Sequence, residues 1–73
     1  MIEVRLFATL RKDRGKILQL NPEDFSTGTQ ILEHLNIPNE DVAIFLINGF
    51  HSKPEDTVKD GDILAIFPPV GGG

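Results

Sequence analysis

A single segment of the chain has helical periodicity, and it lies between segments with the periodicity of strands. Thr27, followed three residues later by a glutamine, has the spacing of a capping box, in which the hydroxyl satisfies an orphan backbone N–H and the amide reaches back. Ile31 and Leu35 then share one helical face. Pro38 disfavours helical geometry in the residue before it. These signals predict one helix over residues 28–36.

Four longer strands and one short strand are predicted from apolar segments that turn residues separate. They lie near residues 2–8, 16–20, 42–48 and 63–67, with a short returning strand at 50–52 after an Asn-Gly hairpin turn. One helix packed on one mixed sheet is the two-layer α+β arrangement. We expect the first and last strands to pair in parallel at the sheet centre. The expected core is Val4, Leu6, Leu18, Ile31, Leu35, Ile47, Leu64 and Ile66.

Composition excludes several classes of function. The chain has 73 residues and no cysteine, so we expect one small domain without disulfides or thiol catalysis. His34 and His51 do not have the spacing of a metal site. The net charge of −4 disfavours nucleic acid as the main partner. No apolar run approaches the roughly 20 residues that span a bilayer, and the N-terminus lacks a signal-peptide pattern, so we expect a soluble cytoplasmic domain.

The sheet face opposite the helix is predicted to be unusually apolar. Phe7 follows the alternation of the first strand onto its polar side, and residues 42–47 are six apolar residues in a row. A single helix covers only one sheet face, so the other face is expected to expose Phe7, Phe67, Ile44 and Leu46. Monomeric proteins rarely expose large contiguous apolar patches, and we interpret this face as a docking surface for a partner.

The last six residues are predicted to form a flexible tail, 68–73, after a folded domain over 1–67. Pro68 and Pro69 end the last strand because neither can donate a ladder hydrogen bond. The terminal glycines have no side chains and add nothing to a core. At 3.3–3.6 Å per residue the tail extends roughly 20 Å, which suffices to present the terminal carboxylate to another protein's active site.

Four short segments together resemble one known family. They are residues 2–11, 47–49, 60–62 and 67–73, and the last of them, Phe-Pro-Pro-Val-Gly-Gly-Gly, is the most specific. In order and spacing they resemble the ubiquitin-like sulfur carriers, in particular the small subunit of molybdopterin synthase. The resemblance runs nearly end to end and implies the β-grasp (ubiquitin-like) fold.

The resemblance also implies a mechanism in which Gly73 is the reactive residue. A ubiquitin-activating-like adenylyltransferase consumes ATP to adenylate the carboxylate of Gly73, and sulfur then displaces AMP to leave a thiocarboxylate. The carrier docks on the larger molybdopterin synthase subunit and donates this sulfur for molybdenum cofactor biosynthesis. It is non-catalytic alone and binds no cofactor. The implied partner-binding residues are Phe7, Arg11, Ile44, Leu46, Phe67, Pro68, Pro69, Val70, Gly71 and Gly72.

Two features of the sequence do not fit a purely apolar docking surface. Four basic residues fall between positions 11 and 16, which favours a solvated hairpin loop, while the resemblance supports Arg11 as a contact for an acidic partner. His51 occupies a position where the family's docking surface tends to carry an apolar residue, and Phe50 beside it is the candidate replacement.

The sequence leaves the receiving pathway open. Carriers of the thiamine thiazole pathway also end in two glycines, and a ubiquitin-like modifier would be conjugated through the same Gly73. A third alternative is a non-covalent adaptor with an inert tail, which the glycine-rich terminus disfavours. All of these share one fold, so the fold does not decide between them.

Overall fold

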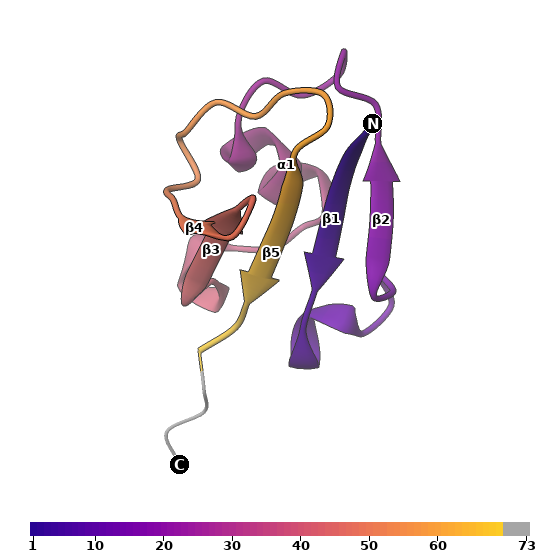
Figure 1. The fold of residues 1–73 in the computed structure, drawn as a ribbon. Coiled ribbons are helices and arrows are strands. Elements are labelled where there is room, and N and C mark those ends of the chain that lie inside the picture. Colours follow the sequence, from indigo (N-terminus) through magenta and orange to yellow (C-terminus); the bar gives the residue numbers. More distant parts are fainter. Residues whose placement is uncertain (70–73) are drawn as a thin grey trace.

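The computed structural model describes residues 1–69, and residues 70–73 lie outside the described part. The strands are β1 (Ile2–Leu6), β2 (Ile17–Leu20), β3 (Ile44–Ile47), β4 (Phe50–His51) and β5 (Ile63–Phe67). The helices are α1 (Gly28–His34) and two short 3-10 turns, η1 (Ala8–Arg11) and η2 (Asn39–Asp41). Helix α1 crosses one face of the sheet, and the other face has no helix among the described residues (Figure 1).

The sheet is mixed, with the strand order β2-β1-β5-β3-β4. Strands β1 and β5 are parallel neighbours, with Val4 opposite Leu64. The other neighbouring pairs are antiparallel. The predicted α+β class, the central parallel pairing and the β-grasp arrangement are therefore confirmed.

Three predicted boundaries are wrong because a turn intervenes. The first strand was expected to reach residue 8, but it ends at Leu6, since Ala8 has a left-handed φ of 54° and begins η1. The helix ends at His34 rather than residue 36, because Asn36 is also left-handed, with φ 58°. The third strand begins at Ile44 rather than residue 42, because η2 ends at Asp41 and Val42 is its C-cap. The other strand boundaries lie within one residue of the prediction.

The core lies between α1 and the sheet. Five predicted core residues are fully buried, namely Val4, Leu6, Ile31, Leu64 and Ile66. The other three, Leu18, Leu35 and Ile47, are half-buried and pack against this cluster. The prediction omitted Ile2, Leu10, Leu32, Ile37, Phe45 and Val58, which are also buried. Leu10 and Val58 are single apolar residues in polar segments, so no periodicity marked them.

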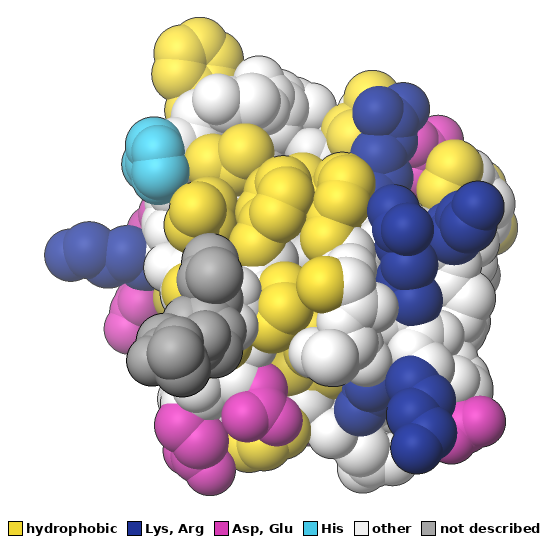
Figure 2. Space-filling view, turned by 90° about the horizontal axis from the view of Figure 1, so that it is seen from below, with side chains coloured by type: hydrophobic (Ala, Val, Ile, Leu, Met, Phe, Trp, Pro, Cys, Tyr) yellow, Lys and Arg dark blue, Asp and Glu magenta, His cyan; other side chains and the backbone are white. Residues whose placement is uncertain are grey.

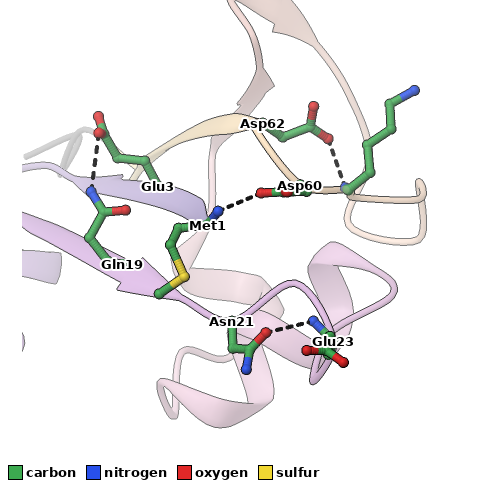
Figure 3. A network of polar contacts seen from close by, with 8 residues as sticks. Met1, Glu3, Gln19, Asn21, Glu23, Asp60 and Asp62 are labelled. Atoms are coloured by element: carbon green, nitrogen blue, oxygen red, sulfur yellow. Dashed lines mark hydrogen bonds and ion pairs between the residues drawn. The ribbon is translucent and has the colours of Figure 1, made fainter.

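A buried carboxylate joins the β3–β4 turn to the start of β5. Asp62 is 5% exposed, and its Oδ1 accepts a hydrogen bond from Asn48 Nδ2 at 3.0 Å. Its Oδ2 accepts the backbone N–H of Lys59 at 2.9 Å (Figure 3). The Asn48 side chain completes the link, because its Oδ1 accepts the N–H of Ile63 at 2.9 Å. We call this arrangement the Asn48–Asp62 pair.

The predicted cap of α1 forms, with one difference. Thr27 Oγ1 accepts the N–H of Gln30 at 3.4 Å, as a capping box requires. The Gln30 side chain, however, accepts the N–H of Ser26 instead of that of Thr27. The next residue, Gly28, approaches the sheet closely: a Cβ there would lie 2.5 Å from Phe45 Cζ and 2.9 Å from the Pro54 carbonyl oxygen. The first helical residue therefore has no room for a side chain.

Replacing this glycine tests how tightly the helix start is packed. We expect Gly28→Ala to lower the free energy of unfolding by about 1–3 kcal/mol, because the added methyl group overfills the contact with Phe45. Urea denaturation at neutral pH measures the change. Glu33→Ala, at an exposed position of the same helix, is the matched control and should stay within about 0.5 kcal/mol of the parent chain. Equal midpoints for both variants would contradict the packing described above.

Candidate functional site

Two phenylalanine rings stack on the sheet face away from α1. Phe7 directly follows β1 and Phe67 ends β5, and because these strands are parallel and in register the two residues leave the sheet side by side. Their ring centroids are 4.1 Å apart and the ring planes differ by 8°. Both side chains are half-buried. The pair therefore forms a single, partly exposed aromatic surface.

Strand β3 extends this surface. Ile44 is opposite Phe67 in the antiparallel register and is 39% exposed. Leu46 lies two residues further along the same face, opposite Ala65, and is half-buried. We call the set formed by Phe7, Ile44, Leu46, Phe67, Pro68 and Pro69 the apolar patch. Its arrangement on the face opposite the helix agrees with the sequence prediction.

A groove of about 390 Å³ runs through most of the apolar patch. Its lining consists of Phe7, Ala8, Thr9, Ala43, Ile44, Phe67, Pro68 and Pro69. Seen from below relative to Figure 1, hydrophobic side chains gather in the middle of the molecule (Figure 2). Leu46 does not line the groove. Ala8, Thr9 and Ala43 were not predicted, since nothing in an isolated alanine or threonine indicates such a position.

The backbone shapes one wall of this groove. The left-handed conformation of Ala8 turns the chain out of β1 and into η1. Arg11, at the end of η1, reaches back so that its Nε donates to the Leu6 carbonyl oxygen at 2.8 Å. Its guanidinium carbon lies 5.3 Å from the centre of the Phe7 ring, within the range of a cation–π contact. Arg11 therefore stands at the rim of the apolar patch with a fixed orientation.

The basic residues of the β1–β2 connection do not form one cluster. Arg14 points to the end of α1, where its guanidinium donates to the carbonyl oxygens of Leu35 at 2.8 Å and Asn36 at 3.1 Å. The same group also donates to the carbonyl oxygen of Leu10 in η1 at 3.3 Å. It compensates helix-terminal carbonyl groups and so has a structural role. Lys16 instead lines a second hollow beside Phe7, together with Arg5 and Arg11. Figure 2 shows basic side chains along one side of the hydrophobic area.

Three polar side chains, those of Glu3, Arg5 and Gln19, bound the open sheet face on its β2 side. Arg5 Nε donates to the Glu3 carboxylate at 2.5 Å, and Gln19 Nε2 donates to the other carboxylate oxygen at 3.3 Å (Figure 3). The hydrogen bond from Arg5 holds the pKa of Glu3 below its usual value. The apolar patch thus covers the β3–β5 side of this face.

Figure 3 also shows the Met1 ammonium group on the Asp60 carboxylate, which lowers the pKa of Asp60.

His51 and Phe50 lie on opposite faces of the sheet edge. His51 is opposite Leu46 in the register, so it belongs to the open face. Phe50 is opposite Ile47, which packs against the core, so Phe50 is on the helix side although it is 75% exposed. The expectation that Phe50 replaces an apolar residue at the edge of the docking surface is therefore wrong. Side-chain alternation along β4 explains the difference.

After β5 the chain leaves the sheet beside the apolar patch. The Phe67 carbonyl oxygen accepts the N–H of Ala43 at 2.8 Å. Pro68 is half-buried and Pro69 is exposed, and neither has an N–H with which to continue the ladder. The other predicted tail residues, Val70, Gly71, Gly72 and Gly73, lie outside the described residues.

Residues 1–69 contain no helix of the length and apolarity needed to cross a bilayer. In the same range, no three His, Asp or Glu side chains come together as metal ligands would.

The chain is similar to solved structures along nearly its whole length. Small archaeal modifier protein 1 of Haloferax volcanii superposes with a TM-score of 0.77 at 24% identity, covering 94% of this chain and 97% of that one. A chain from the complex of subunits 1 and 2 of the Helicobacter pylori molybdopterin-converting factor superposes with a TM-score of 0.63 at 24% identity. The match covers 99% of this chain and 97% of that one. At these identities the likeness supports the fold alone.

Sequence comparison identifies the family. The molybdopterin synthase sulfur carrier subunit of Haemophilus influenzae is 37% identical over 82 aligned positions, which cover 100% of both chains. The model of the ThiS family matches residues 4–73, a range that includes the apolar patch, the glycine-rich terminus and all of β1 except its first two residues. The chain therefore belongs to the ThiS family.

Proposed function

We propose that this protein is a sulfur carrier of the molybdopterin synthase type, with the carboxylate of Gly73 as the group that carries sulfur. The observation that carries the proposal is the 37% identity, over the whole of both chains, to a molybdopterin synthase sulfur carrier subunit. The geometry agrees with it. Val70 and three terminal glycines follow two prolines that line the groove of the apolar patch, so a partner that docks on the patch is expected to receive the terminus.

The chemistry uses a partner enzyme for each step. In an adenylyltransferase of the ubiquitin-activating type, a Gly73 carboxylate oxygen attacks the α-phosphorus of ATP, and pyrophosphate leaves. The acyl-adenylate is a mixed anhydride, so a persulfide sulfur displaces AMP at the carbonyl carbon. A thiol then cleaves the S–S bond and leaves the thiocarboxylate. In the larger synthase subunit this sulfur becomes part of the dithiolene of the pterin. The carrier itself supplies no acid, base or bound cofactor.

The apolar patch is proposed to dock both partners. Phe7 and Phe67 are the expected anchors, because large aromatic side chains dominate the binding free energy of protein interfaces. Ile44, Leu46 and the two prolines surround them, and Arg11 at the rim is expected to meet an acidic residue of the partner. The residues of the tail from Val70 to Gly72 are expected to enter the partner's active-site channel, where the absence of side chains on the glycines permits a close fit.

Removing one aromatic anchor tests the docking surface. We expect Phe67→Ala to weaken binding to the larger synthase subunit by about 1–3 kcal/mol. The variant should lose less folding stability, about 0.5–1.5 kcal/mol, because the stack with Phe7 disappears. Titration calorimetry and thermal unfolding measure the two effects. Phe50→Ala removes an equally large but more exposed ring from the helix side and should bind normally. If both variants bind equally well, the apolar patch is not the docking surface.

Shortening the terminus tests the carrier chemistry. Incubation of the full chain with the activating enzyme, ATP and a sulfur source should add to its intact mass the difference between one sulfur and one oxygen atom. Deletion of Gly72 and Gly73 should abolish this change while the melting temperature stays the same. A chain extended past Gly73 should also fail, because its amide carbonyl cannot be adenylated. A truncated chain that still accepts sulfur would refute the mechanism, and heavier adducts on other proteins would support a protein modifier instead.

A further inference from the structure

The Asn48-Gly49 turn combines the features of a spontaneous deamidation site. Asparagine loses ammonia when the backbone nitrogen of the next residue attacks its side-chain carbonyl carbon, and glycine hinders this attack least because it has no Cβ. At Gly49, nothing lies within 4 Å of the position that a Cβ would occupy. The other asparagines, Asn21, Asn36 and Asn39, precede proline, isoleucine and glutamate. Asn48 is therefore the most reactive asparagine of the sequence.

The fold restrains this same side chain. Asn48 Nδ2 donates to Asp62 at 3.0 Å, and Oδ1 accepts from the Ile63 N–H at 2.9 Å. The backbone N–H of Asn48 also donates to the Ile63 carbonyl oxygen at 2.8 Å. Ring closure expels Nδ2 and so removes the donor to Asp62. The reaction consequently requires the side chain to leave partners that hold both ends of its amide group.

We propose that Asn48 is a deamidation site that the Asn48–Asp62 pair protects in the folded chain, and that modification at this position loosens the junction of β3, β4 and β5. The proposal is independent of the sulfur-carrier function. It concerns the end of the sheet opposite the apolar patch, since β5 starts beside Asn48 and ends at Phe67.

The reaction needs only water. The Gly49 backbone nitrogen loses its proton to solvent and forms a bond to Asn48 Cγ, the Cγ–Nδ2 bond breaks, and ammonia leaves with a proton from solvent. The product is a five-membered succinimide. Water then opens the ring at either carbonyl carbon, which gives aspartate with the original backbone or isoaspartate with an additional methylene group in the main chain. The net change replaces an amino group by a hydroxyl group, and nothing is oxidised or reduced.

Both products are unfavourable in this environment. A carboxylate at position 48 places an acceptor where the Nδ2 donor stood, 3.0 Å from Asp62 Oδ1. Asp62 is almost inaccessible to solvent whereas residue 48 is exposed, so the two like charges repel each other with only partial screening by water. Isoaspartate also lengthens a two-residue hairpin turn, and a change of turn length shifts the pairing of Ile47 with Phe50. The short strand β4 has little other pairing to hold it.

A rate measurement tests the protection. The full chain is held at 37 °C and mildly alkaline pH, and peptide mapping by mass spectrometry follows each asparagine. We expect slow conversion at Asn48 in buffer, several-fold faster conversion in concentrated urea, and none at the other three sites. Asp62→Asn removes one of two acceptor oxygens without changing the shape, and should speed conversion in buffer. Gly28→Ala, which weakens the fold elsewhere, is the control at matched overall stability.

A swap of the two side chains tests the consequence for the fold. Asn48→Asp should lower the melting temperature by roughly 5–15 °C, as loss of one partly buried hydrogen bond and a like-charge contact predict. The double variant N48D/D62N restores one amide and one carboxylate in exchanged positions and should recover most of this loss. Full stability of Asn48→Asp alone would overturn the proposal, and so would conversion in Asp62→Asn no faster than in Gly28→Ala at equal stability.

Discussion

The parallel pairing of β1 with β5 is the constraint on which the structure depends. It joins the first strand of the chain to the last, with Val4 opposite Leu64 and Leu6 opposite Ile66. All four of these residues are buried, so the pairing and the hydrophobic core stabilise each other. The paired residues are sixty positions apart in the sequence, so the segments between them must pack around these two strands. The helix does so on one face, and the other face is left open.

The candidate docking surface follows from this pairing. Parallel strands in register carry their following residues in the same direction, so Phe7 and Phe67 emerge together although sixty positions separate them. The chain leaves β1 at Ala8, which lines the groove, and Arg11 lies over the Phe7 ring at the rim of the apolar patch. An alternative topology with β1 and β5 apart would separate the two rings. The same contact that completes the core therefore also assembles the surface.

The sequence predicted those features that depend on periodicity or on turn residues. The helix, the five strands, the parallel pairing and the apolar face followed from alternation, from Asn-Gly and Asp-Gly signals and from the prolines. Features that depend on single backbone or tertiary contacts were not predicted. The left-handed Ala8 has no sequence signal, since alanine rarely adopts that conformation. The hydrogen bonds by which Arg14 joins the end of α1 to η1 cannot be predicted without the fold. Side-chain alternation along β4 placed Phe50 on the unexpected face.

The stacking of Phe7 on Phe67 within the free chain also affects the thermodynamics of association. Each ring already has its orientation fixed by the other, at 4.1 Å between centroids, and Arg11 further restricts Phe7. The conformational entropy of these side chains is therefore lost during folding. A surface that must order its side chains on contact loses about 0.5–1.5 kcal/mol for each one immobilised. A preorganised surface avoids this loss, so a small domain can bind successive partners through the same few residues with a modest contact area.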